Sequence, residues 1–200
     1  MQEKAPPKPN AQRSAETRQA LMEAARRLFL DQGVAETGTP QIVKAAKVTR
    51  GALYHHFSDK TDLFRAIISS EAEDVANQIQ RQTRDSTAPI DALINGAATY
   101  FDAMAIPGRA RLLLIDGPAI LGADEMRDVD RQTGGEELRL GLQAMVDAGL
   151  MDAPVDAVAE LLSAMFDKAA LAIAGGQSAD AYKTATNRVL RGLFNTTGNA

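Results

Sequence analysis

Apolar side chains recur along almost the whole chain at the spacing of an α-helix. Between residues 15 and 32 they form a stripe of i, i+3, i+4 and i+7 positions, made of Leu21, Ala24, Ala25, Leu28 and Phe29. Gly33 follows at a position typical of a helix end. This pattern predicts an amphipathic helix over residues 15–32.

Two short helices are predicted next. Thr39 and Pro40 are residue types favoured at the N-cap and the first position of a helix, which predicts a short helix beginning there. Thr49 can cap a second one, after a tight turn at Lys47. The inward side chains would be Ile42, Val43, Ala46, Val48 and Leu53. Two short helices after a longer one are the layout of a helix-turn-helix motif, here at about residues 37–56.

The rest of the chain keeps the helical period. Further helices are predicted from Ser58 or Asp59 to about 84, and over 89–104, 111–115, 122–131, 136–148, 154–174 and 179–194. Convincing strand alternation is absent from the sequence. The pattern therefore predicts an all-α protein of about nine helices.

Composition narrows the class of protein. The 200 residues allow one or two small domains, and 45% hydrophobic with 24% charged residues is typical of globular chains. The absence of Cys excludes disulfides and thiolate metal sites. Residues 1–13 are Pro-rich and polar, which favours a disordered tail and not a secretory signal. With apolar runs far shorter than the roughly 20 residues of a membrane span, we expect a cytoplasmic protein with no membrane partner.

Charge is unevenly distributed along the chain. Residues 1–65 hold 11 Lys and Arg against 7 Asp and Glu, whereas residues 66–200 hold 11 against 19. A basic first part suggests contact with nucleic acid. Chance clustering is the plainer explanation, because the excess is small.

The outward side chains of the second short helix suit a DNA groove. These are Thr49, Arg50, Gly51, Tyr54 and His55. Arginine can bond both acceptors of guanine, glycine lets the backbone approach closely, and Tyr and His can donate to phosphate oxygens. Thr39 and Lys60 lie at helix N-termini, where the backbone N–H groups favour phosphate.

The residues Val48-Thr49-Arg50-Gly51-Ala52-Leu53-Tyr54-His55-His56-Phe57, with Lys60 downstream and Leu28-Phe29 upstream, resemble the DNA-binding domain of the tetracycline-repressor (TetR) family. The resemblance covers residues 14–74. It implies that Tyr54 and His56 contact phosphates, and that Thr49, Arg50, Gly51 and His55 face bases or the groove. It further implies a three-helix N-terminal domain and a C-terminal regulatory and dimerisation domain over residues 75–200. The expected function is that of a ligand-responsive repressor on a palindromic double-stranded operator.

Two positions depart from the family pattern. The family usually has Gly where this chain has Lys47, so Lys47 is expected either to adopt left-handed backbone angles, at about 1 kcal/mol, or to alter the turn. Its charge also makes it a candidate contact to the DNA backbone. Gly38 stands where a small hydroxyl residue is common, which removes one candidate phosphate contact.

The C-terminal part supplies candidate ligand-binding residues for a small-molecule effector of unknown identity. They are Phe101, Met104, Leu113, Asp116, Met126, Met145 and Phe166. Methionine more often fills a core, and Asp116, like Arg109 and Arg111, is equally explained as a helix-end charge.

Apolar stripes over residues 155–174 and 179–194 predict a homodimer through a four-helix interface. The alternative is that the same stripes close the core of a monomer.

Other functions are disfavoured by the residues. His55 and His56 are adjacent, so on a helix they point about 100° apart and make a poor metal pair. Nucleophile, base and orienting group do not occur together, and Asp128 and Asp130 indicate a solvated face. We therefore expect neither an enzyme nor a metal or other cofactor. A helical bundle that binds only proteins is the remaining alternative, but it has no reason to display the residues of the second short helix.

Overall fold

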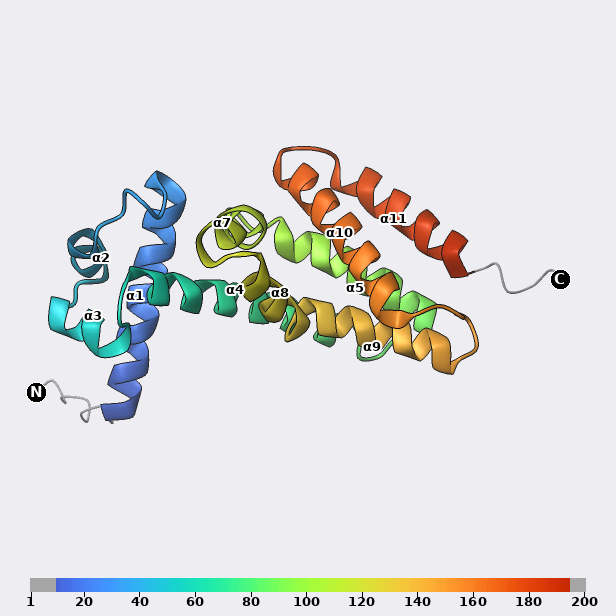
Figure 1. Ribbon diagram of the computed structural model, residues 1–200, viewed down its shortest axis with the longest axis horizontal. Helices are drawn as coiled ribbons and strands as arrows, with labels where there is room; N and C mark the ends of the chain where they lie inside the picture. Colours follow the sequence, from blue (N-terminus) through green and yellow to red (C-terminus); the bar gives the residue numbers. More distant parts are fainter. Residues whose placement is uncertain (1–9, 195–200) are drawn as a thin grey trace, which may run out of the picture. The chain divides into compact units, whose positions relative to one another are not determined.

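The computed structural model describes residues 10–194, which form helices and no strand (Figure 1). They divide between residues 67 and 68 into an N-terminal unit, described over residues 10–67, and a C-terminal unit, described over residues 68–194. The helices are α1 (Asn10–Gln32), α2 (Thr39–Ala46), α3 (Arg50–His56), α4 (Lys60–Thr83), α5 (Pro89–Met104), α6 (Arg109–Arg111), a π-helical turn η1 (Leu112–Asp116), α7 (Gly117–Leu121), α8 (Ala123–Arg131), α9 (Gly134–Asp147), α10 (Val155–Ala174) and α11 (Ala179–Phe194). The predicted all-α class is confirmed.

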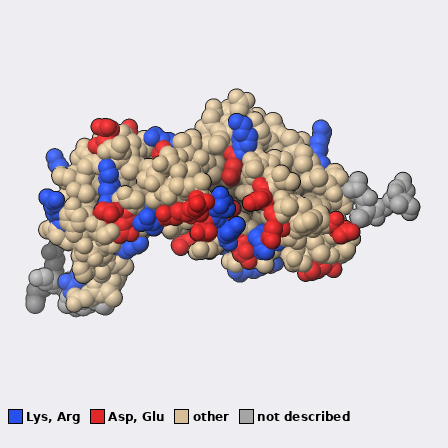
Figure 2. All heavy atoms as spheres, viewed as in Figure 1, with Lys and Arg blue, Asp and Glu red and all other residues tan. Residues whose placement is uncertain are grey.

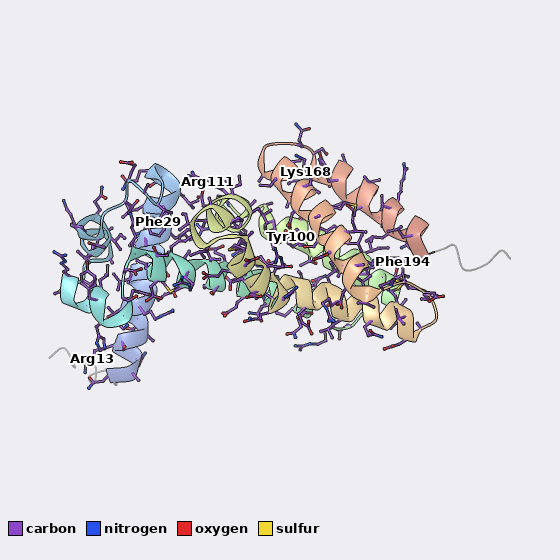
Figure 3. All side chains as sticks on the ribbon, viewed as in Figure 1. Arg13, Phe29, Tyr100, Arg111, Lys168 and Phe194 are labelled. Carbon is purple, nitrogen blue, oxygen red and sulfur yellow. The ribbon has the colours of Figure 1, made fainter. Side chains whose placement is uncertain are left out.

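The N-terminal unit packs α1, α2, α3 and the first turns of α4 around one core. Leu21, Ile42 and Leu53 bring one fully buried side chain each from α1, α2 and α3. Phe29 of α1 meets Phe64 of α4 edge to face, with ring centroids 5.8 Å apart (Figure 3). Burial of these side chains fixes α2 and α3 against the two longer helices, because apolar area removed from water is the main stabilising term.

Helix α1 begins five residues before the sequence predicts. Asn10–Arg13, expected to belong to a disordered tail, are helical. The hydroxyl of Thr17 donates to the carbonyl of Arg13 over 2.9 Å, and Gln12 bonds Glu16 one turn on. These local bonds extend the helix beyond its apolar stripe. Residues 1–9 of the predicted tail lie outside the described residues.

In the C-terminal unit, α9, α10 and α11 pack against α5. Its core includes Leu93 and Phe101 of α5, Leu142 of α9, and Leu162 and Phe166 of α10. The rings of Phe101 and Phe166 meet at 88° with centroids 5.9 Å apart, an edge-to-face contact that ties α5 to α10.

The stretch 109–121 is less regular than predicted. The sequence predicts one short helix ending near Asp116-Gly117-Pro118, whereas the structure has α6, η1 and α7 in succession. Pro118 has no N–H to give to the preceding turn, which favours a widened turn at η1. A Cβ on Gly117 would lie 2.8 Å from the Met126 sulfur, so the Met126 side chain of α8 would have to shift if this residue were larger than glycine.

A buried ion pair anchors this stretch to α4. The Arg109 guanidinium, 4% exposed, contacts the Glu71 carboxylate at 2.5 Å and the Asp74 carboxylate at 3.4 Å. It also donates to the Ala103 carbonyl over 3.2 Å. Arg109 is therefore a structural residue of this unit.

Within residues 10–194, the helices are too short or too polar to span a membrane.

Candidate nucleic-acid interface and ligand cavity

Local hydrogen bonds determine where α2 and α3 begin. The Thr49 hydroxyl accepts the Ala52 N–H at 3.1 Å, which caps α3 as the sequence predicts. At α2 the cap is Gly38, whose own N–H donates to the Gln41 side chain over 2.7 Å. Neighbouring residues thus determine where α2 and α3 begin. The first turn of α3 is exposed to solvent.

The turn between α2 and α3 is left-handed at Lys47. Its φ is 56° and its ψ 39°, and within residues 10–194 it is the one non-glycine residue with positive φ. The predicted left-handed conformation is confirmed. Its backbone N–H donates to the last carbonyls of α2, which offsets part of the steric cost of about 1 kcal/mol or more. The side chain is exposed.

Arg50, Tyr54 and Thr39 form one polar cluster on the surface of the N-terminal unit. The Arg50 guanidinium lies over the Tyr54 ring, 5.5 Å from its centroid. A hydrogen bond from Arg50 lowers the pKa of the exposed Tyr54 hydroxyl, and a hydrogen bond from Thr39 acts in the same direction. The structure therefore brings together three predicted residues from α2 and α3. Figure 2 shows Lys and Arg side chains on the surface of this unit.

Gly51 and His55 are exposed on the same short helix, and His56 is half-buried beside Phe57. A Cβ on Gly51 would meet only the Thr49 hydroxyl, at 3.9 Å, so packing within the protein does not require glycine here. Burial lowers the pKa of His56, and the nearby charges of His55 and Arg18 lower it further. A neutral His56 retains one N–H to donate. Within residues 10–194 there is no group of three or more metal-ligand side chains.

Lys60, predicted to contact phosphate, has partners within the protein. Its ammonium donates to the carbonyls of Val34, Ala35 and Thr37 at 2.7, 3.1 and 3.0 Å. An ammonium has three donors, and all three are used inside the N-terminal unit. Lys60 therefore ties the start of α4 to the loop between α1 and α2, and its contact with phosphate is left as a prediction.

The C-terminal unit contains two adjoining chambers. The larger has a volume of about 970 Å³ and the smaller about 180 Å³. Both are lined by Tyr100, Asp130, Gly134, Gly135, Leu138, Ser163 and Asp167. The larger volume is that of a small-molecule site. Helix α4 contributes Ala72 and Val75 to its wall.

The predicted ligand-binding residues are divided among several places. Met104, Leu113 and Met126 line the larger chamber, and Phe166 lines the smaller one. Phe101 lines a separate groove against α11.

Two of the predicted ligand-binding residues line neither chamber. Met145 is fully buried and serves as core, the plainer reading of a methionine. Asp116 lies beside Arg111, with the carboxylate 3.1 Å from the guanidinium. The structure therefore does not support Met145 and Asp116 as lining residues of the chambers, and no ligand contact is proposed for them.

Sequence reasoning missed the polar residues of the shared wall. Tyr100 of α5 is labelled in Figure 3, and its hydroxyl donates to the Asp167 carboxylate of α10 over 2.5 Å. Burial raises the pKa of Tyr100 well above its ordinary value, and burial also raises the pKa of Asp167. The pKa of Asp130 is raised to about 6, first by burial and then by repulsion from Asp167.

Asp130 was expected on a solvated face; it is exposed, and it also lines both chambers. Its carboxylate accepts the Gly135 N–H. A Cβ on Gly135 would lie 2.5 Å from the Asp130 carboxylate oxygen, so the glycine makes this approach possible. The Gly134-Gly135 pair after the helix was the available signal in the sequence.

Two family descriptions match the chain. "Bacterial regulatory proteins, tetR family" matches residues 21–67, which contain α2 and α3. "Tetracyclin repressor-like, C-terminal domain" matches residues 90–197, more than half of the chain. The two matches fall on the unit with the exposed short helix and on the unit with the chambers.

Named proteins are similar over part or all of the chain. The HTH-type transcriptional regulator AcrR of Shigella flexneri is 36% identical over 104 residues, 52% of this chain and 48% of AcrR. The HTH-type transcriptional repressor BepR of Brucella suis is 49% identical over 55 residues, 28% of this chain and 26% of BepR. The chain thus spans half or less of these relatives. A TetR-family regulator structure from Pectobacterium atrosepticum is 27% identical, covers 94% of this chain and 98% of its own, and has a TM-score of 0.71.

Proposed function

The chain belongs to the TetR family of bacterial regulatory proteins, and on that basis we propose that it is a transcriptional repressor released from operator DNA by a small molecule. The family is one of regulators and not of enzymes, and we propose no catalytic role. Action on chromosomal DNA assigns the protein to the cytoplasm. The sign of regulation rests on the relative named as a repressor.

The observation that carries DNA binding is the exposed first turn of α3. Arg50 and Tyr54 are exposed, lie in contact and are joined by Thr39 of α2, while Gly51 offers bare backbone between them. We assign Arg50 to a base edge, and Tyr54 and His56 to phosphates. Thr49, Gly51 and His55 face the groove, and Lys47 adds a cation at the turn.

The chambers carry the effector proposal. Helix α4 begins in the N-terminal unit at Lys60, and its second half lines the larger chamber. A ligand shifts an equilibrium only through unequal affinity for its two states. The effector therefore binds free protein more tightly than operator-bound protein, and the operator weakens effector binding by the same factor.

A homodimer is the proposed binding form. Leu162, Phe166 and Leu190 of the predicted stripes are buried within the chain, as the monomer-core alternative requires. Leu161, Val189 and Leu193 of the same helices are 74%, 42% and 52% exposed and support pairing with a second copy. A two-fold dimer matches a palindromic operator, one recognition helix for each half-site.

Selection of bound duplexes from a randomised DNA pool tests the function. We expect an inverted repeat to be enriched. Arg50→Ala should weaken binding to the enriched site by about 1–3 kcal/mol and relax the preference at one position of each half-site. Arg188→Ala, at an exposed arginine of α11, is the control and should leave the preference unchanged. Enrichment of no sequence, or an unaltered preference in Arg50→Ala, would contradict the proposal.

A further inference from the structure

The smaller chamber has an electrostatic character that the larger one lacks. Its charged lining residues are all acidic, namely Asp130, Glu137 and Asp167 from α8, α9 and α10. Most of the remaining wall is apolar and includes Leu93 and Phe166. A chamber of this composition repels anions. A neutral ligand would bring no positive charge to pair with the acidic side chains of the chamber.

The two inner aspartates have neutral partners. Within residues 10–194, the hydrogen bond assigned to Asp167 comes from the Tyr100 hydroxyl, and that of Asp130 comes from the Gly135 N–H. The carboxylates repel one another across the chamber, as the pKa of Asp130 reflects. Two nearby carboxylates in a partly enclosed site are stabilised by a cation.

The arginines around the larger chamber are already paired with other acids. Arg127 contacts Asp124 at 3.0 Å, Arg131 contacts Asp128 at 3.8 Å, and Arg139 contacts Asp156 at 2.9 Å. Figure 2 shows acidic and basic side chains interleaved over α8 and α9. These arginines therefore pair with carboxylates other than those of Asp130 and Asp167.

The inner acids are also held in position. Asp130 lies against the backbone at the start of α9, where only glycine at 135 leaves room for its carboxylate. Tyr100 holds Asp167 from α5, and its ring lies 6.3 Å from that of Phe166. The arrangement presents two carboxylates and two aromatic rings to one small volume, a combination that suits a cation with an apolar body.

We propose that the effector is an organic cation, a protonated amine or a related ammonium, whose charged end lies between Asp130 and Asp167 in the smaller chamber. Its apolar body fills the larger chamber against Met104, Leu113 and Met126. The inference rests on the proposed function in that it names the ligand class of the proposed effector site.

Calorimetric titration of the full chain, without DNA, tests the proposal with three probes of one size: n-octylammonium, n-octanol and n-octanoate. Octylammonium should bind at least tenfold more tightly than either of the others. Asp167→Asn and Asp130→Asn keep the side-chain volume and should each lower octylammonium affinity at least tenfold. Asp128→Asn is the matched control on α8, because this exposed aspartate pairs with Arg131, and it should leave the affinity unchanged.

Equal affinity for the three probes, tighter binding of octanoate, or unchanged affinity in both inner variants would overturn the inference. The probe comparison uses the wild-type chain, so it stands even if a variant fails to fold. Sequence-selective DNA binding is measured separately. Loss of the cation preference with intact operator selection refutes the ligand class alone, whereas cation binding without operator selection refutes the proposed repressor and not the cation site.

Discussion

Asp128 and Asp130 lie two positions apart on α8 and are both exposed, yet only Asp130 lines the chambers. Asp128 is 67% exposed at its side chain and pairs with Arg131, whereas Asp130 faces the smaller chamber beside Asp167. The sequence around them predicts a solvated face for both. The difference arises from α9, which packs against α8 and brings the Gly135 N–H to the Asp130 carboxylate. The hydrophobic pattern around these two residues does not show which later helix packs against α8.

Asp130→Asn should stabilise the protein at neutral pH. The folded-state pKa of about 6 exceeds the ordinary value of 3.8, so the folded chain binds the proton more tightly. This contribution to stability is full below pH 4 and is lost as pH rises through 6. Asparagine removes the cost of ionisation, by about 1 kcal/mol at pH 7.5 after allowance for solvent screening. The other titratable groups lining the chamber are Tyr100, Glu137 and Asp167.

Urea unfolding of wild type and Asp130→Asn at pH 4, 5, 6 and 7.5 checks this expectation. The difference in unfolding free energy should grow across the series and vanish at pH 4. Asp128→Asn should show no such growth. A constant difference at all four pH values would contradict the assignment of the raised pKa to Asp130.

Gly51→Ala separates folding from DNA contact. The added Cβ meets only the Thr49 hydroxyl at 3.9 Å, and alanine is the better helix former, so the unfolding free energy should stay level or rise by up to about 1 kcal/mol. DNA affinity should nevertheless fall at least tenfold, because the methyl group occupies space needed for close approach to the groove. Fluorescence anisotropy on the selected duplex measures the loss. Gly192→Ala, where the Cβ also meets open space, is the control. Unchanged DNA affinity in Gly51→Ala would contradict a close approach of DNA at this position.

At the scale of elements, the sequence predicted the regular helices well and the interruptions poorly. The i, i+3, i+4 stripes located α1, α5, α10 and α11, and Thr49 capped α3 as expected. The π-helical turn at Leu112–Asp116 was missed, although Pro118, which has no N–H to give to the preceding turn, is visible in the sequence. The carbonyl partners of Lys60 were also missed, because they lie more than 20 residues earlier in the chain.

The ion pair of Arg109 and Glu71 should be the most sensitive polar contact of the C-terminal unit. Arg109→Met leaves the 8% exposed Glu71 without its guanidinium, and such losses cost about 3–5 kcal/mol. Adding Glu71→Gln should restore part of the stability, since the buried charge is then removed too. Thermal unfolding followed by circular dichroism compares the variants. Lys183→Met, which breaks the more exposed pair with Asp102, should cost under about 1 kcal/mol. Equal losses in Arg109→Met and Lys183→Met would contradict a buried role.

At the scale of the whole molecule, a division of the chain into two parts could be predicted from the sequence, with a boundary at residues 74 and 75 where the structure has it at 67 and 68, while the cavity could not be predicted. The short-helix motif is local, with all its residues within Thr39–His56. The chambers are built by residues from α4, α5, α8, α9 and α10, spread from Ala72 to Leu171. Their lining becomes visible only once these helices are packed. The same holds for α10 and α11, whose stripes combine buried and exposed apolar positions.

Leu161→Glu should convert the protein to a folded monomer. Leu161 is 74% exposed within one chain, so a charge there costs the monomer little, yet it is unfavourable in an apolar interface of α10 with a second copy. Light scattering should give twice the 21.3 kDa chain mass for wild type and the single mass for the variant. Binding to the full inverted repeat should weaken to the level of a half-site, because one recognition helix remains.

Two control variants accompany this test. Leu162→Glu, at a 4% exposed neighbour, should instead unfold the chain, and Leu140→Glu, exposed on α9, should leave the dimer intact. A wild-type mass of 21.3 kDa at micromolar concentration, or a dimeric Leu161→Glu, would refute pairing through these helices.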